Sequence, residues 1–297
     1  MKLISLGILC FFCEIIFSQT HVSLNKIEHL EIPKTTYYND IIFHKGYSLL
    51  YNEKHEQASW VAYELTKNET IKAFQRTNKF IIDPYVKTGS ATNADYIGSG
   101  FDKGHLAPAA DMSWSEVAMI ESFYLSNMSP QLPSFNRGIW KKLEELVRNW
   151  AYENESIYVV TGPVLRDSLP TIGESKVSVP EYFYKVILDY SEPDLKGICF
   201  LIPNKISNEP LQNYAMSIDS LENLTHIDFY PLLPDSNETL IEKTLCIDCW
   251  LWNKNNSSNK NIEPSIITSS QCKGFTKKGN RCKNETKNTS GYCYLHE

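Results

Sequence analysis

Short apolar runs rich in β-branched and aromatic residues recur through the middle of the chain. Runs of this length and composition are typical of buried strands rather than helices. The pattern predicts four strands, at residues 59–65, 157–165, 182–188 and 198–202.

Two segments have a helical pattern instead. Residues 115–126 begin at Ser115, a residue type that caps helix N-termini well. In residues 136–150 apolar side chains recur at spacings of three and four, which places them in one buried stripe: Ile139, Leu143, Leu146 and Trp150. Strands mixed with such helices predict an α+β fold.

The two ends of the chain differ from its middle. Lys2 precedes an apolar run that ends near Ser18, a pattern that predicts an export signal and hence a secreted or periplasmic protein with no membrane attachment after cleavage. An uncleaved anchor is the alternative. The predicted organisation is a signal peptide at 1–18, an N-terminal extension at 19–45, a main domain at 46–252, an Asn/Ser-rich linker at 253–271 and a Cys/His-rich basic module at 272–297.

Composition and charge narrow the function. The chain has 297 residues, of which 42% are hydrophobic, and this excludes a disordered or collagen-like protein. The net charge of −6 argues against a protein that coats nucleic acid through an extended basic face. Residues 272–297 contain six basic and two acidic residues, so a basic tail follows an acidic body. Any phosphate-binding role must therefore be local.

Residues 101–109 contain the densest group of chemically useful side chains. An imidazole with an ordinary pKa of about 6.5, such as that of His105, is mostly neutral at pH 7 and accepts a proton. Gly104 allows the backbone to approach a bulky substrate. Asp102 is suited to orienting a neighbouring group or a metal-bound water, and Lys103 to meeting a phosphate. A lone histidine in a half-apolar strand is more often structural than catalytic, so the surrounding residues decide.

Those surrounding residues resemble the DNA/RNA non-specific endonucleases of the ββα-metal, or His-Me finger, class. The family's Asp-Arg-Gly-His motif is matched by Asp102, Gly104 and His105, whereas Lys103 replaces the usual arginine. Further matches follow in order over roughly residues 45–235: Arg76, Asn127 with Pro130 and Gln131, Asn136 with Gly138 and Trp140, Leu143 with Glu144, and segments 159–164, 179–186 and 227–231. The resemblance implies a ββα-metal finger nuclease fold with a central, mainly antiparallel sheet flanked by helices.

The resemblance also implies a single-metal site that hydrolyses phosphodiesters of DNA and RNA and leaves 5′-phosphate ends. It makes His105 the general base and Asn136 the one direct protein ligand of Mg²⁺, an ion that usually keeps several waters; Mn²⁺ is an alternative ion. Glu144 would hold one of those waters. The other implied site residues are Arg76 and Arg148, facing the scissile phosphate, together with Asp102, Lys103 and Asn127.

Plainer interpretations of these residues stay open from the sequence alone. Glu144 and Arg148 are spaced as an exposed helical salt bridge, and Asn136 is a common helix-capping residue. A non-catalytic nucleic-acid-binding protein that retains the nuclease fold is the alternative function. Besides DNA and RNA, a second copy of the chain and an inhibitor protein are partners that the family resemblance leaves open.

The cysteines suggest a separate site in the tail. Cys199 lies in an apolar strand and is expected to be a buried small residue. Cys246 and Cys249 form either a local disulfide or half of a metal site. The tail supplies three thiols and one imidazole, a set suited to tetrahedral Zn²⁺, with disulfides and free thiols as alternatives: Cys272, Cys282, Cys293 and His296.

Overall fold

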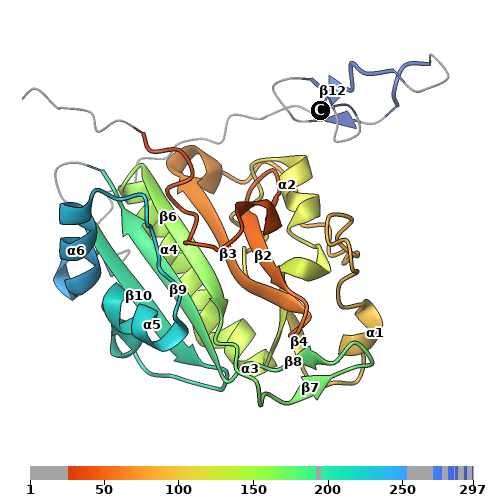
Figure 1. Ribbon diagram of the computed structural model, residues 1–297. Coiled ribbons are helices and arrows are strands. Elements are labelled where there is room, and N and C mark those ends of the chain that lie inside the picture. The colour runs from red at the N-terminus through yellow and green to blue at the C-terminus, as the bar shows by residue number, and fades with distance from the viewer. Residues whose placement is uncertain are drawn as a thin grey trace, which may run out of the picture.

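The computed structural model describes residues 26–191, 195–252, 270–275, 280–283, 285–286, 291–292 and 296. The predicted signal peptide at 1–18 lies outside the described residues, as does most of the predicted linker at 253–271. The main body contains a seven-stranded sheet in which all neighbours are antiparallel (Figure 1). In spatial order its strands are β1 (Ile41–Phe43), β2 (Ser48–Asn52), β3 (Gln57–Thr66), β6 (Ser156–Pro163), β9 (Tyr182–Asp189), β10 (Lys196–Pro203) and β11 (Ala215–Met216).

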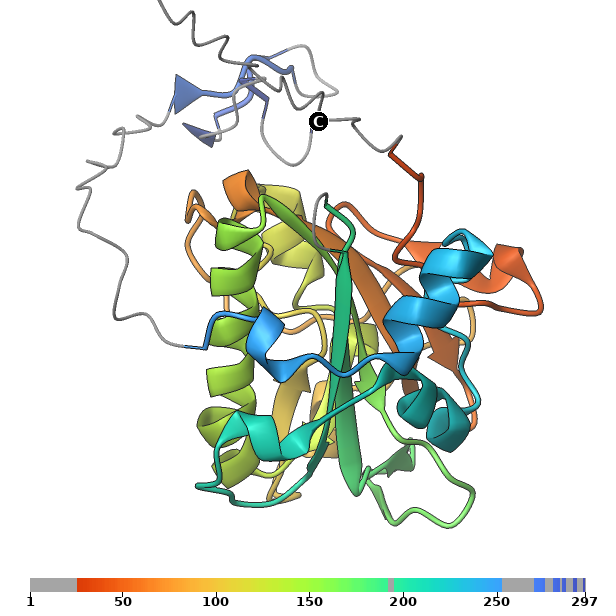
Figure 2. The same ribbon diagram turned by 90° about the vertical axis from the view of Figure 1, so that its left-hand side faces the viewer.

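The sheet is the middle layer of three (Figure 2). Helix α4 (Lys141–Glu153) covers one face, and α5 (Ile218–Thr225) and α6 (Asp235–Lys243) cover the other. Alternate residues of a strand point to opposite faces, so Val159 packs with the α4 side and Val160 with the α5 side. Burial on both faces explains why the four predicted strands appear as continuous apolar runs, and all four are confirmed within two residues at each end. The predicted α+β class is confirmed as well.

The predicted helix at 115–126 is shorter than expected. Helix α2 (Glu116–Glu121) begins after Ser115, whose hydroxyl accepts the backbone N–H of Ala118 as predicted for a cap. The chain then leaves the helix, because the N–H of Leu125 donates to the carbonyl of Ile81 and draws residues 125–127 into a 3₁₀ turn.

The predicted helix at 136–150 is interrupted. A short helical turn α3 (Pro133–Phe135) is followed by a π-type turn at Asn136–Trp140, and only then does regular α4 begin. Gly138 has φ −103° and ψ −112°, which are not helical values, and a glycine adopts them at low cost. One extra residue in a turn redirects the side chains before it relative to those after it. The side chains of Asn136 and Glu144 therefore do not have the relative orientation that an uninterrupted α-helix would give them.

Short elements complete the fold. Strands β4 (Asp102–His105) and β5 (Met128–Gln131) form an antiparallel pair that leads into α3 and α4. The remaining elements of the body are α1 (Asn93–Tyr96), β7 (Thr171–Ile172), β8 (Val177–Ser178) and 3₁₀ turns at Tyr38–Asp40, Lys67–Thr70, Leu211–Tyr214 and Ile247–Cys249. In the tail, β12 (Ser270–Gln271) pairs with β13 (Glu285–Thr286). No described helix is both long and apolar enough to span a bilayer.

The segments before β1 and after α6 pack on opposite sides of the sheet. Leu30 and Ile32, from the part of the predicted extension that the structure describes, are buried in the core on the α5 side. Trp250 stacks on Trp150 of α4, with ring centroids 4.4 Å apart. Cys199 is fully buried in β10, as expected. Cys246 and Cys249 form a disulfide, which decides between the two alternatives for this pair.

Candidate active site

Strand β4 and the turn before α4 meet at Asp102. The Asn136 Nδ2 donates to Asp102 Oδ2 at 2.9 Å. Arg137 adds two bonds to the same carboxylate, from Nε to Oδ2 at 2.8 Å and from NH2 to Oδ1 at 2.6 Å. These hydrogen bonds and the charge of Arg137 outweigh desolvation and lower the pKa of Asp102. The side chain of Asn136 thus bonds to Asp102 of strand β4 instead of capping a helix.

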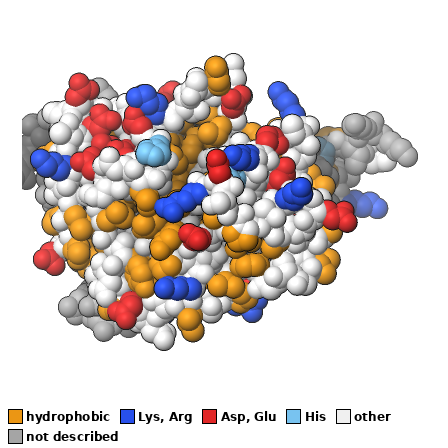
Figure 3. Space-filling view, turned by 60° about the horizontal axis from the view of Figure 1, so that its bottom comes forward, with side chains coloured by type: hydrophobic (Ala, Val, Ile, Leu, Met, Phe, Trp, Pro, Cys, Tyr) orange, Lys and Arg blue, Asp and Glu red, His pale blue; other side chains and the backbone are white. Residues whose placement is uncertain are grey.

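A pocket of about 460 Å³ opens beside this junction. It is lined by both polar and aromatic residues: Arg76, Phe80, Tyr96, Ile97, Phe101, Asp102, Lys103, Asn136 and Arg137. Figure 3 views the molecule from the end at which β4, α1 and α3 lie in Figure 1, and there basic, acidic and apolar side chains are interspersed. No extended basic surface is visible on this face, in agreement with the charge of the chain.

His105 lies at the end of β4, behind one wall of the pocket. Its ring packs against Phe80, a pocket residue, at 5.8 Å between centroids and edge-on against Phe123 at 4.8 Å. The imidazole is buried, and its Nε2 has no hydrogen-bond partner among the described residues. Burial, helped by the nearby positive charge of Arg76, lowers the pKa of His105 to about 3. The imidazole is therefore neutral at physiological pH, and none of the described residues uses its Nε2.

Gly104 has a packing role inside the protein. A Cβ at this position would lie 2.1 Å from Oε1 of Gln131, so the glycine accommodates a side chain of the paired strand β5. Close approach of a substrate is not needed to explain it.

Lys103 and Arg76 place two positive charges on aromatic faces of this region. The Lys103 Nζ lies 4.6 Å from the centroid of the Phe80 ring and 5.8 Å from that of Tyr96. The Arg76 guanidinium lies 5.0 Å from the centroid of Phe123, the ring that also packs on His105. Both side chains line the pocket, where a cation held on a ring keeps its charge available to an anion. The lysine that replaces the usual arginine is thus part of the pocket.

Glu144 and Arg148 project from α4 into a buried charge cluster with Asp111 and Lys185. The Arg148 NH1 donates to Asp111 Oδ1 at 2.7 Å, and Tyr63 donates its hydroxyl to Asp111 Oδ2 at 2.7 Å. Arg148 is therefore not the partner of Glu144 in an exposed helical salt bridge, which was the plainer interpretation of their spacing.

Lys185 is fully buried in β9, and its Nζ has no hydrogen-bond partner among the described residues. Burial raises the pKa of Glu144 and lowers that of Lys185, while the attraction between the two groups opposes both shifts. Arg76 also interacts electrostatically with Glu144, so the cluster is coupled to the residues that line the pocket.

Sequence reasoning assigned no role to Asp111 or Lys185. Lys185 carried a usable signal, because a single lysine inside the apolar run of a strand buried on both faces needs a charged partner. Asp111 carried none, since its pairing with Arg148 joins residues that lie 37 positions apart.

Asn127 is fully buried and does not line the pocket. Its Oδ1 accepts the N–H of Ala107 at 2.9 Å, while its Nδ2 donates to the carbonyls of Ala107 at 2.9 Å and Ser122 at 2.8 Å. The side chain thus fixes the backbone that directly follows His105. Its geometry suits a positioning role, and no contact with a substrate is indicated.

Replacing Asn127 by alanine is expected to lower the free energy of unfolding by about 3 kcal/mol, since three buried hydrogen bonds are lost at about 1 kcal/mol each. Urea denaturation measures this change. Asn223→Ala is the matched control, because the Asn223 side chain makes one exposed hydrogen bond to Asp219, and its effect is expected to stay within about 0.5 kcal/mol. Equal effects of the two substitutions would contradict a clamping role for Asn127.

Comparison with known proteins gives this geometry a context. The sequence pattern of the family described as DNA/RNA non-specific endonuclease matches residues 28–236. The chain is 36% identical over 221 residues to "Nuclease EXOG, mitochondrial" of Xenopus laevis, covering 68% of this chain and 60% of that protein. It is 35% identical over 203 residues to "Endonuclease G, mitochondrial" of Homo sapiens, covering 63% of this chain and 68% of that protein.

A solved structure agrees with these relatives. A chain in the crystal structure of the EndoG/EndoGI complex superposes with a TM-score of 0.63 at 31% identity, covering 66% of this chain and 88% of that chain. The predicted ββα-metal finger fold is confirmed by this match. The chain spans about three fifths of the length of the EXOG relatives that it matches.

These relatives correct one expectation. The prediction of a secreted or periplasmic protein is wrong, because the similar nucleases of Xenopus laevis and Homo sapiens are mitochondrial. The prediction depended on residues 1–18, which lie outside the family match, and an apolar run behind a single lysine carries little information about the compartment. The matched region contains the pocket, the buried histidine and the charge cluster, and over this region the chain belongs to the DNA/RNA non-specific endonuclease family.

Proposed function

We propose that the protein is an endonuclease that hydrolyses phosphodiester bonds of DNA and RNA with His105 as general base, a divalent cation as cofactor and 5′-phosphate ends as products. One observation supports this most strongly. The buried, neutral imidazole of His105 packs against Phe80 of the pocket, and its Nε2 has no hydrogen-bond partner among the residues that the structure describes. The same pocket is lined by two cationic side chains, Arg76 and Lys103, and by Asn136.

The pocket fits a hard divalent cation such as Mg²⁺, with Mn²⁺ as the alternative ion. Because Nδ2 of Asn136 donates to Asp102, the amide oxygen Oδ1 is left as an acceptor at the pocket. Mg²⁺ favours oxygen ligands, keeps several waters and is commonly held by very few protein groups. When bound, the ion would supply Lewis-acid stabilisation to the phosphoryl and leaving oxygens.

The residues of the chain have separate tasks in this proposal. His105 takes a proton from the attacking water through Nε2, a step that its neutral state at physiological pH permits. Arg76 and Lys103 bind phosphate oxygens, and Lys103 does so as a point charge rather than as a planar fork. Asp111, which itself accepts a hydrogen bond from Tyr63, holds the guanidinium of Arg148 in a fixed position, so that its charge needs no rearrangement as negative charge grows on the phosphate.

Glu144 completes the proposed site as the carboxylate that holds a cation-bound water. Its neighbours Lys185 and Arg148 favour the ionised form, although burial opposes it. Arg, Lys and Asn side chains contact phosphates and sugars, which carry no direct information on base sequence. We therefore expect cleavage of both DNA and RNA with little sequence preference.

A plasmid assay tests the proposed activity. Supercoiled plasmid and a folded RNA are incubated with the purified protein in Mg²⁺ or in excess chelator, and the ends are typed by their sensitivity to phosphatase and ligase. We expect loss of both substrates in Mg²⁺ only, with 5′-phosphate ends. Binding of both nucleic acids without any cleavage, under all these conditions, would favour a non-catalytic binder.

The pH dependence of cleavage should reflect the buried imidazole. An unperturbed histidine would become protonated and inactive as a base below about pH 6.5. Since the pKa of His105 is lowered to about 3, its neutral form persists on the acid side, and kcat/KM should stay nearly constant between pH 7 and pH 5. Initial rates on a short duplex at saturating cation measure the profile.

Arg76→Met supplies the comparison for this profile, because the positive charge of Arg76 is the second cause of the lowered pKa. In Arg76→Met we expect the decrease of kcat/KM on the acid side to begin at a higher pH than in the unsubstituted protein. This shift is expected whether or not the substitution also lowers the maximal rate. A midpoint near pH 6.5 in the unsubstituted protein would contradict the buried, neutral base.

Regulation by another protein is a second part of the proposal. A relative was solved in the EndoG/EndoGI complex, whose description concerns the inhibition of EndoG. We propose that an inhibitor protein of similar kind binds this chain as well.

A further inference from the structure

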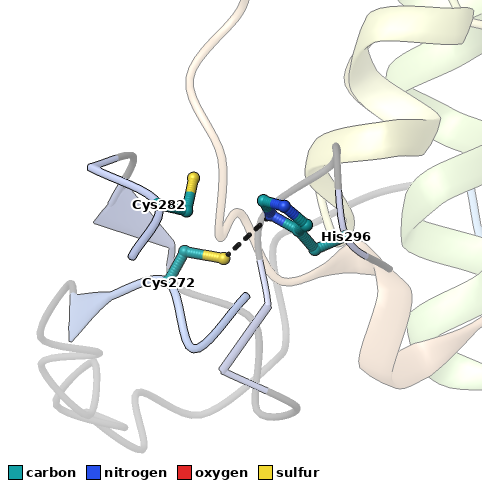
Figure 4. Close-up of side chains that lie close together, drawn as sticks. All are labelled: Cys272, Cys282 and His296. Atoms are coloured by element: carbon teal, nitrogen blue, oxygen red, sulfur yellow. Dashed lines mark hydrogen bonds between the residues drawn. The ribbon is translucent and has the colours of Figure 1, made fainter. Parts of the chain in front are cut away.

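The described pieces of the tail converge on two sulfurs and one imidazole. Cys272 follows β12, Cys282 lies a few residues before β13, and His296 is near the C-terminus. Their ligand atoms, the two Sγ and one ring nitrogen, all lie within 4.8 Å of one another. Figure 4 shows the three side chains together and the contact between the Cys272 sulfur and the His296 ring.

The spacing within this cluster suits a tetrahedral metal ion. The Cys272 Sγ and the His296 Nδ1 are 3.4 Å apart. For Zn–S of about 2.3 Å, Zn–N of about 2.0–2.1 Å and a tetrahedral angle, the two ligand atoms should be separated by about 3.6 Å. The observed separation is therefore close to that of two ligands on one zinc ion.

The groups around the ligands fix their chemical state. His296 Nε2 lies 3.0 Å from the carbonyl of Phe275, which accepts only, so Nε2 carries the proton and Nδ1 presents its lone pair toward the Cys272 sulfur. A ring nitrogen bound to a backbone carbonyl is the usual outer support of a metal-ligating histidine. The backbone N–H of Gly274 donates to the Cys272 Sγ at 3.3 Å and fixes the position of this sulfur.

Gly274 also makes room for the imidazole. A Cβ at this position would lie 2.3 Å from the His296 ring, so any larger residue would push the ring away from the two sulfurs. The glycine in the Cys-x-Gly segment thus has a positional reason in this cluster.

The described residues of the tail bury little apolar surface. Among its described residues, the buried apolar cluster consists of Cys272 and Cys282, while Phe275 is 64% and Tyr292 39% exposed. These two aromatic side chains are exposed while the two sulfurs are buried, the reverse of an ordinary hydrophobic core. A segment this small needs a cross-link such as a disulfide or a bound metal ion to be stable, because apolar packing alone does not suffice.

We propose that the tail binds one Zn²⁺ through Cys272, Cys282 and His296, and that this ion is structural and separate from the cation of the nuclease pocket. Thiolate and imidazole ligands select zinc over Mg²⁺ or Ca²⁺, which take oxygen ligands. Cys293, the fourth ligand expected from the sequence, lies outside the described residues, so the proposal depends on the other three.

Metal analysis of the full chain tests this site. The protein is purified under reducing conditions, passed through a brief chelator wash and analysed by elemental mass spectrometry. We expect about one zinc per chain, and at least a tenfold loss of zinc in both Cys272→Ser and His296→Ala. Asn136→Ala should keep its zinc, because Asn136 belongs to the nuclease pocket, and so should the double variant Cys246→Ser/Cys249→Ser, which lacks the disulfide.

A second measurement covers the case in which the substituted tails do not fold. Co²⁺ replaces zinc in the unsubstituted protein, and the absorption bands of tetrahedral thiolate coordination are expected. Absence of zinc and of these bands would overturn the proposal. So would zinc that persists in Cys272→Ser, or non-reducing peptide mapping that finds Cys272 or Cys282 in a disulfide. None of these outcomes depends on cleavage of nucleic acid, so the experiment tests the zinc site independently of the proposed nuclease function.

Discussion

Replacing His105 by alanine should lower the rate of plasmid cleavage by about 10²–10⁴-fold, the usual contribution of a positioned general base. In the proposed mechanism the imidazole is the base, and its Nε2 has no hydrogen-bond partner in the described part of the chain, so its removal leaves the attacking water without a proton acceptor. Affinity for Mg²⁺ should change little, because His105 does not line the pocket with Asn136. The first-order rate of nicking at saturating Mg²⁺ measures the loss.

A matched control separates chemistry from stability. His29→Ala removes a side chain that is 50% exposed and lies outside the pocket, so this variant should cleave at the rate of the unsubstituted protein. Far-ultraviolet circular dichroism checks that His105→Ala remains folded. A folded His105→Ala protein that retains more than about a tenth of the rate would contradict its role as the base.

Replacing Asn136 by alanine should raise the Mg²⁺ concentration needed for half-maximal cleavage by at least 10–100-fold, since even the outer partners of metal ligands contribute this much to affinity. The substitution removes the amide oxygen at the pocket and also one hydrogen bond to Asp102. Arg137 still holds Asp102 through two bonds, so the local structure should persist. A Mg²⁺ titration of the nicking rate measures the shift.

The design of this titration also tests the cause of the loss. Very high Mg²⁺ should restore part of the activity of Asn136→Ala, whereas no concentration should restore His105→Ala. Asn213→Ala is the control, because the Asn213 side chain bonds only to exposed Glu209 among its described partners. An unchanged Mg²⁺ requirement in Asn136→Ala would remove this residue from the cation site.

The central strands were predictable because they are buried on both faces. An uninterrupted apolar run such as that of β9 has few other structures open to it. The structure places all four such runs side by side, with β1 and β2 beyond one end of the group and β11 beyond the other. Strands β4 and β5 were not predicted. They are four residues long and consist largely of polar residues and glycine, so tertiary pairing rather than local preference forms them.

The ends of the helices were predicted less well than their buried faces. The pattern of Ile139, Leu143, Leu146 and Trp150 correctly indicated the buried face of α4, and all four side chains are buried. It contained no sign of the π-type turn at Asn136–Trp140, which depends on the backbone of Gly138. A single glycine in a helix usually lowers its stability by only about 1 kcal/mol relative to alanine, so its presence does not predict that the helix is interrupted.

For the site, the sequence indicated the residues that line the pocket but only two of the four residues in the charge cluster, Glu144 and Arg148. Asp102, Lys103 and Asn136 were found by motif and line one pocket in the structure. Asp111 and Lys185 were given no role, because their partners on α4 are distant in sequence and the contacts depend on packing. Buried charges of this kind need partners to offset their desolvation, and such partners become visible only in three dimensions.

The most direct test of the central claim is to locate the cation itself. Crystals of His105→Ala, which should bind nucleic acid without cleaving it, are grown with a short duplex and Mn²⁺, and the anomalous signal of Mn²⁺ is mapped. The proposed site predicts one peak at about 2.2 Å from Oδ1 of Asn136, with a phosphodiester between the ion and position 105. A peak held by other side chains, with Asn136 outside bonding distance, would contradict it.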